Sequence, residues 1–222
     1  MSELKEKIKE AVNKHLDTAI ALSKDLAEHP ELPYQEFESS RKMAEILKEA
    51  GFEVTYPYAG YDTAYCAKLD NGDGPSVALL AEYDALPEIG HGCGHNLHGS
   101  LSVLSGLALM DLKDKFKGKL YVIGTPAEEE NGAKIGMAEQ GIFDDMSMAV
   151  MMHSSSGGYS LPDMDVLSLR CYEVEFFGET AHAVAAPWNG KSALSAARKF
   201  LDLIDARREC FTPDIHVNSV IL

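Results

Sequence analysis

The feature of this sequence that most restricts its fold is a series of short apolar segments, each followed directly by a polar loop. Residues 76–81, 119–124 and 147–152 are segments of this kind. Stretches with helical periodicity lie between and around them. Short buried strands that alternate with helices indicate an α/β fold, with a mixed sheet and helices on both of its faces. In such folds, sites are built where the strands end.

The remaining pattern adds helices and strands around this series. Pro30 is expected to end the first helix and Gly51 the second. Helices are expected over residues 4–27, 36–50, 97–112, 133–140 and 191–208, and further strands over 52–58, 63–69, 166–177 and 216–222. A second structural unit is expected to begin near Ser160.

Charge and cysteine content exclude some classes of protein. The formal net charge is -15, which would repel the phosphates of nucleic acid and of an anionic membrane. No apolar run approaches the roughly 18 residues that a bilayer span requires, and the charged N-terminus resembles no signal peptide. The four cysteines are widely separated, which favours a reducing, cytoplasmic setting over a disulfide framework.

Side chains that bind metals follow each of the three apolar segments. If the segments are neighbouring parallel strands, their loops meet at one edge of the sheet. The residues brought together in this way are Asp84, Cys93, His95, Glu128, Glu129 and His153. Thiolate, imidazole and carboxylate together suit zinc and the later divalent transition metals better than magnesium or calcium.

The loop from Gly90 to Asn96, GHGCGHN, carries the densest part of this set. Its glycines allow the backbone to fold closely around an ion. Cys93 and His95, separated by a single glycine, are the predicted ligands. We expect His91 only to flank the loop and His98 to lie on the following helix.

The adjacent glutamates suggest a division of roles. Successive side chains of an extended segment point in opposite directions. One of Glu128 and Glu129 could therefore bind a metal while the other faces the metal-bound water as general base. Asp84 is expected to accept a hydrogen bond from a ligand histidine and orient it.

Each piece also has a non-functional interpretation. A single buried histidine is usually structural, and an acidic run such as 128–130 is usually a solvated loop. From its local pattern alone, His182 would be a surface histidine at the end of a strand. The three loops favour a metal site because they follow successive buried strands.

These residues also resemble a known family. The stretches Ala81–Pro87, Gly90–Asn96 and Pro126–Glu129 are similar to the amidohydrolase branch of the aminoacylase and carboxypeptidase G metallopeptidases. This branch includes hippurate, auxin-conjugate and aminobenzoyl-glutamate hydrolases and a group of dipeptidases. Further similar stretches are His29–Leu32 with Glu36, and Ala181–Gly190.

The resemblance implies a catalytic α/β domain that binds two divalent ions, zinc, manganese or cobalt, and an inserted lid through which the subunits form a homodimer. Residues 1–160 would be the N-terminal part of the catalytic domain and 161–222 part of the lid. The implied metal ligands are Cys93, His95, Glu129 and His153. Glu128 would be the general base, and His182 would stabilise the oxyanion in the partner subunit's site.

The implied reaction is hydrolysis of an amide bond in an N-acyl amino acid or dipeptide by a metal-activated water. Asn96, where many members have aspartate, and the triplet Glu82-Tyr83-Asp84 favour the dipeptidase and aminobenzoyl-glutamate group. Members are nearly twice as long, and a last metal-binding histidine lies beyond the lid. We therefore expect the chain as given to be incomplete, with weak metal binding and little activity.

The alternative function is that of a non-catalytic remnant that retains the dimerisation surface. A redox or metal-storage role centred on Cys93 is disfavoured, because no resolving cysteine lies nearby.

Overall fold

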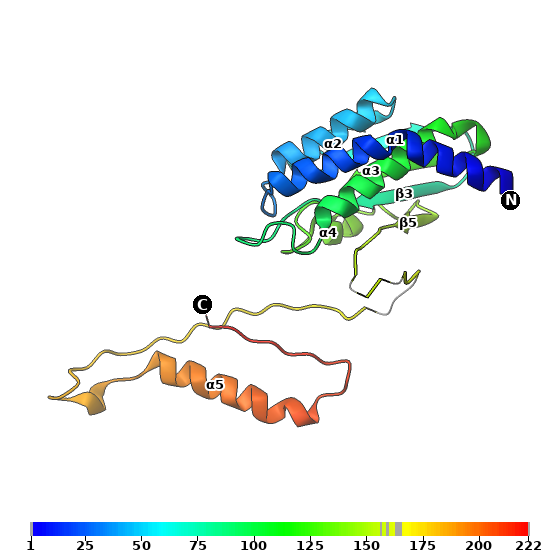
Figure 1. The fold of residues 1–222 in the computed structure, drawn as a ribbon. Coiled ribbons are helices and arrows are strands. Elements are labelled where there is room, and N and C mark those ends of the chain that lie inside the picture. Colours follow the sequence, from blue (N-terminus) through cyan, green and yellow to red (C-terminus); the bar gives the residue numbers. More distant parts are fainter. Residues whose placement is uncertain (1, 156, 159, 163–165, 222) are drawn as a thin grey trace. The chain divides into compact units, whose positions relative to one another are not determined.

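The computed structural model describes residues 2–155, 157, 158, 160–162 and 166–221. Two compact units are present, Met1–Tyr159 and Ser160–Leu222, and Figure 1 shows the elements of each. The assignment of the first to a catalytic domain and of the second to a lid remains a prediction. No helix among the described residues is long and apolar enough to cross a membrane.

The first unit is built on a mixed five-stranded sheet with the order β1-β2-β4-β3-β5. The strands are β1 (Glu53–Thr55), β2 (Tyr65–Asp70), β3 (Ser76–Ala81), β4 (Lys119–Gly124) and β5 (Met148–Val150). β3 pairs in parallel with both β4 and β5, while β2 pairs antiparallel with β1 and β4. The predicted mixed sheet is therefore confirmed.

Helices cover both faces of this sheet. α1 (Ser2–Glu28), α2 (Phe37–Glu49) and α3 (His95–Asp111) lie on one side (Figure 1), and the short α4 (Ala133–Glu139) packs on the other. Side chains alternate along a strand. Tyr65 and Ala67 of β2 therefore pack in the hydrophobic cluster under α1, α2 and α3, while Cys66 packs in the cluster under α4. This alternation confirms the expected helices on both faces.

The helix α3 lies unusually close to the end of β3. A Cβ atom at Gly99 would come within 2.5 Å of the Glu82 carbonyl oxygen and 2.2 Å of Met43 Cε, so only glycine fits there. The close approach places the first turn of α3, with His95 and His98, beside the residues that follow β3. Packing of the helix thus brings two histidines to the edge of the sheet.

Two predicted strands of the first unit are shorter than expected. The strand predicted over 52–58 is reduced to β1, because Pro57 has no N–H to donate to a ladder. The strand predicted over 147–152 ends at Val150, where pairing with Leu79 ends. The described part of the chain also has 3₁₀ turns at Lys113–Lys115 in the first unit and at Pro187–Asn189 and Arg208–Cys210 in the second.

The described residues of the second unit include one α-helix, α5 (Ala193–Arg207). The predicted strands over 166–177 and 216–222 are wrong for the described residues, which form no strand there; Leu222 lies outside the described residues. A strand requires a hydrogen-bonded neighbour, and the described part of this unit supplies only an isolated bridge between Glu179 and Lys191. None of its described side chains is buried.

Candidate metal centre

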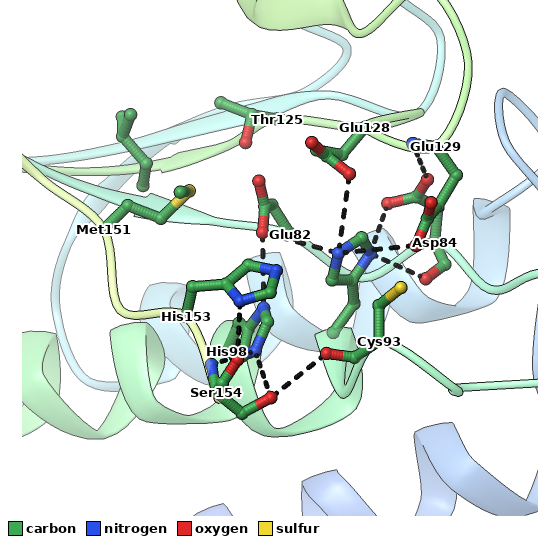
Figure 2. A network of polar contacts seen from close by, with 12 residues as sticks. Glu82, Asp84, Cys93, His98, Thr125, Glu128, Glu129, Met151, His153 and Ser154 are labelled. Atoms are coloured by element: carbon green, nitrogen blue, oxygen red, sulfur yellow. Dashed lines mark hydrogen bonds and ion pairs between the residues drawn. The ribbon is translucent and has the colours of Figure 1, made fainter. Parts of the chain in front are cut away.

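Three loops meet at the edge of the sheet where the parallel strands end. The last residues of β3 and β4, Ala81 and Gly124, are register partners, and β5 ends alongside β3. The segments that follow these strands therefore emerge at the same edge. The convergence that the sequence predicted is present, and Figure 2 shows side chains from all three loops around one centre.

His95 lies at the middle of the centre and is buried. Its Nδ1 lies 3.0 Å from the Asp84 carbonyl oxygen and 2.9 Å from Asp84 Oδ1, so Nδ1 carries the proton and donates. The remaining nitrogen, Nε2, then keeps a free lone pair. Asp84 Oδ2 in turn accepts from the Glu129 backbone N–H at 2.9 Å. Asp84 makes the contact with a histidine that the sequence predicted.

Two glutamates approach the free nitrogen of His95. Its Nε2 lies 3.7 Å from Glu128 Oε2 and 3.9 Å from Glu129 Oε1. Among the described residues, these atoms form one of two groups in which all candidate ligand atoms lie within 4.8 Å of one another. His95 Nε2 and Glu129 Oε1 are also buried without a hydrogen-bond partner. Two acceptors that face each other in this way favour a cation, a proton or a metal ion, between them.

The donor set fits a divalent metal. Nitrogen and oxygen ligands lie about 2.0–2.2 Å from a bound zinc ion, so ligands of one ion are roughly 3–4 Å apart. The spacings around His95 Nε2 fall in that range. Burial opposes protonation of His95, but the hydrogen bond and charge of Asp84 and the nearby glutamates outweigh it and raise the pKa of His95. The centre therefore attracts positive charge.

The glutamate loop differs from the expected extended segment. Residues 128–131 form a turn, and Ala127 before it has a φ of 60°. Both Glu128 and Glu129 consequently face His95 rather than opposite sides, which corrects the sequence prediction. Their exposure still differs: the Glu128 side chain is 40% exposed and that of Glu129 is 17% exposed. The buried carboxylate of Glu36 holds this loop by accepting from the Ala127 N–H at 2.8 Å.

The second of the two groups of candidate ligand atoms comes from Glu82, His95, His98 and His153. Glu82 follows β3 directly and is fully buried. Burial opposes its ionisation, yet the hydrogen bond with His98 and the ion pair with Lys134 outweigh burial and lower the pKa of Glu82 to about 2. Its Oε2 lies 3.6 Å from His95 Nε2, so Glu82 adds negative charge to the centre.

His153 belongs to the loop after β5. Its Nδ1 lies 2.7 Å from the Ser154 carbonyl oxygen and donates to it, so Nε2 keeps its lone pair. The His153 ring lies 4.3 Å from the His98 ring and 6.0 Å from the His95 ring, measured between centroids. The predicted ligand is thus near the centre and has the tautomer that a metal requires.

Cys93 lies beside Glu129 but outside both groups of ligand atoms among the described residues. The hydrogen bond of its thiol with the Glu129 carboxylate raises the pKa of Cys93 to about 11. The thiol is therefore protonated in this arrangement, and binding of a metal would have to release that proton. His91 also stays outside both groups, and burial lowers its pKa.

Asn96 and His182, which the sequence singled out, both form hydrogen bonds outside the centre. Asn96 donates from Nδ2 to the Ser23 carbonyl oxygen at 3.1 Å, which ties the start of α3 to α1. His182 belongs to the second unit and is exposed. Its Nδ1 accepts from the N–H groups of Val184 and Ala185 at 3.2 and 3.1 Å, so its Nε2 carries the proton.

Glu82, His98 and Ser154 were not assigned roles from the sequence, although all three contact the centre. The sequence contained a signal for Glu82 and for His98. Glu82 and Asp84 are two residues apart after a strand, a spacing that places side chains on one side. His95 and His98 are three apart on a helix and share a face. The contact of Ser154 with His98 depends on tertiary packing alone.

Comparison with known proteins agrees with this geometry. The model for peptidase family M20/M25/M40 matches residues 78–212, which include the whole centre. The chain belongs to that family. It is an enzyme family of metal-dependent hydrolases, and the mixed sheet with helices on both faces is consistent with the fold of its members.

The curated relatives are about twice the length that the chain spans. The mouse (Mus musculus) Xaa-Arg dipeptidase is 32% identical over 98% of this chain and 53% of its own length. A p-aminobenzoyl-glutamate hydrolase subunit from Escherichia coli K12 is 30% identical over 88% of this chain and 44% of its own. The Bacillus subtilis YXEP protein, described as a dinuclear metal binding peptidase of the M20 family, is 29% identical with a TM-score of 0.54, covering 64% of this chain and 42% of that one.

Proposed function

We propose that this chain carries the metal centre and general base of an amidohydrolase that cleaves N-acyl amino acids or dipeptides. The observation that carries the proposal is the pair of buried, unpartnered atoms His95 Nε2 and Glu129 Oε1, with Glu128 beside them. The relatives' substrates, a dipeptide and aminobenzoyl-glutamate, both contain such an amide bond.

The proposed ligands are Cys93, His95, Glu129 and His153, and the full-length subunit is expected to hold two ions of zinc, manganese or cobalt. A bound divalent metal polarises the substrate carbonyl and lowers the pKa of water towards about 7. Asp84 holds the ring of His95 by accepting from Nδ1, which keeps Nε2 directed to the centre.

Glu128 is the proposed general base. Its carboxylate is accessible at 40% exposure while Oε2 stays 3.7 Å from His95 Nε2, so water and substrate can reach it beside the proposed ligands. In this role Glu128 takes the proton of the attacking water and delivers it to the leaving amine.

His182 is the proposed oxyanion donor, acting in the site of a partner subunit of a homodimer. Because its Nδ1 accepts from the chain's own backbone, the proton lies on Nε2 and is available for donation. A cytoplasmic location is part of the same proposal and is supported by the four free cysteines.

Hydrolysis of a panel of N-acyl amino acids and dipeptides by the full-length protein tests the proposal. Glu128→Gln should lower kcat by roughly 10²- to 10⁴-fold. Glu130→Gln is the matched control, since Glu130 is an exposed neighbour in the same turn. Full activity in Glu128→Gln would refute the role of this glutamate.

A second candidate function is a non-catalytic dimerisation protein. The exposed apolar side chains of the second unit, such as Tyr172 and Phe177, favour it. Absence of hydrolysis across the panel, together with a stable dimer, would support this function instead.

A further inference from the structure

His98 belongs to the second group of candidate ligand atoms, but both of its ring nitrogens already have hydrogen-bond partners. Its Nε2 lies 2.8 Å from the Ser154 backbone nitrogen, and its Nδ1 lies 3.3 Å from Glu82 Oε2. Figure 2 shows the ring between these two partners. A ligand histidine needs one nitrogen free for the metal, and neither nitrogen of His98 is free.

The hydrogen bonds also fix the position of the ring proton. A backbone N–H can only donate, so Nε2 of His98 must be the acceptor towards Ser154. Nδ1 then carries the proton and donates it to the Glu82 carboxylate. The second oxygen of Glu82 is paired with Lys134, which holds the carboxylate in place. His98 is therefore anchored on one side and holds Ser154 on the other.

Ser154 connects two loops that carry proposed ligands. Its hydroxyl lies 3.1 Å from the Cys93 carbonyl oxygen and donates to it. Its own carbonyl oxygen accepts from Nδ1 of His153 at 2.7 Å. Residues 151–155 form no helix or strand, so the regular ladder of the sheet does not hold this loop. Its link to α3 through His98 is thus a main constraint on where His153 lies.

Gly94 provides independent support for this close contact. A Cβ atom there would meet Ser154 Oγ at 2.6 Å and His98 Nε2 at 3.6 Å. The backbone at Gly94 also has a φ of +82°, which other residues rarely adopt. The loop around Cys93 has room for Ser154 only because position 94 has no side chain.

We propose that His98 is a positioning residue: it binds the backbone of Ser154 and thereby fixes the loops of His153 and Cys93, and it is not itself a metal ligand. This inference rests on the metal centre of the proposed function. In this role His98 is held by the buried Glu82, whose carboxylate is paired with the partly exposed Lys134.

Cobalt(II) binding followed by visible absorption tests the inference, because the absorption bands report the ligand set. We expect His98→Ala to weaken Co²⁺ binding about 10- to 100-fold, the usual effect of losing a residue that orients a ligand. At saturation the bands should match those of wild type. His98→Gln, whose amide oxygen can accept from the Ser154 N–H, should recover most of the affinity. His29→Ala, at an exposed histidine of the same unit, is the matched control.

The outcomes separate the inference from the proposed function. If wild type binds no Co²⁺, the metal centre itself is wrong. If wild type binds and His98→Ala changes the saturated spectrum or the number of ions bound, His98 is a ligand and the inference is wrong. Unchanged affinity in a folded His98→Ala protein would also overturn it.

A measurement on the metal-free protein provides a second test. Amide hydrogen exchange at Ser154 should be slow in wild type and in His98→Gln, because its N–H is bonded to a buried acceptor. The exchange should become at least about tenfold faster in His98→Ala, while amides of β3 keep their protection. Equal exchange at Ser154 in wild type and His98→Ala would show that the contact does not hold the loop.

Discussion

In residues 1–159 the apolar side chains gather into two buried clusters on the faces of a sheet, whereas in residues 160–222 the described apolar side chains remain accessible to solvent. Both regions have comparable apolar sequence patterns. The first places each apolar strand next to another strand, and the second has only one isolated bridge among its described residues. Apolar patterning alone therefore does not bury a segment; it also needs a pairing partner.

The same contrast holds for the histidines. His95 is buried and oriented by Asp84, while His182 is exposed and contacts its own backbone neighbours. A centre with fixed geometry requires rigid surroundings. The packed first unit provides them for the proposed metal ligands, and a role for His182 depends on contacts made outside its own unit.

The largest expected difference between the two regions is in how much a leucine-to-alanine substitution lowers the free energy of unfolding. Leu47 of α2 is 0% exposed, and Leu203 of α5 is 67% exposed. We expect Leu47→Ala to lower the free energy of unfolding by about 2–5 kcal/mol because it leaves a cavity. Leu203→Ala should change it by less than about 0.5 kcal/mol. Urea denaturation measures both, and similar losses in the two variants would contradict the comparison.

An intermediate effect is expected at the start of α5. Ser192 caps this helix, since its Oγ accepts from the Ser195 N–H at 3.1 Å. Because no residue of the helix is buried, this local bond should contribute a larger share of its stability. Ser192→Ala should destabilise α5 by about 1 kcal/mol, seen as faster amide exchange at residues 195 and 196. Ser195→Ala, which keeps the N–H donor, is the control; equal exchange in the two variants would rule out the cap.

The smallest effect is expected for an ion pair on the surface of the first unit. Asp111 of α3 accepts from Lys14 at 2.8 Å and contacts His15 at 2.9 Å, both on α1. The hydrogen bond from Lys14 lowers the pKa of Asp111, so its contribution is present above the ordinary pKa and is lost as the pH falls through the lowered value. Asp111→Asn should cost about 0.2–1 kcal/mol at pH 7, with the difference from wild type vanishing in acid.

Glu179→Gln provides the counterpart in the second unit, where the partner is Lys191 at 2.6 Å. Both side chains of that pair are largely exposed, so a smaller change is expected than for Asp111→Asn. A loss for Asp111→Asn that is independent of pH would show that its charge is not the cause.

Much of the first unit could be predicted from the sequence, because its strands are marked by short-range sequence patterns. The strands at 76–81 and 119–124 have the predicted bounds, because each is an apolar run bordered by turn residues. Given parallel neighbours, the convergence of their loops followed from topology. The convergence of the loops that carry the proposed ligands could therefore be predicted without knowledge of individual contacts.

The details that could not be predicted depend on tertiary contacts. The turn at 128–131, which directs both glutamates to His95, follows from a positive φ at Ala127 that no sequence rule requires of alanine. The contact of His98 with Ser154 depends on the close approach of α3 to β3 at Gly99. The failure of 166–177 to form a strand reflects a missing partner, which the strand's own residues do not reveal.

Residues of the first unit, centred on His95, are proposed to form a divalent metal site. The most direct test is a zinc-binding titration of the chain and of His95→Ala, with His29→Ala as the control. We predict that wild type and His29→Ala bind zinc alike and that His95→Ala binds at least about 100-fold more weakly. Absence of zinc binding by wild type, or an unchanged isotherm for a folded His95→Ala protein, would contradict this claim.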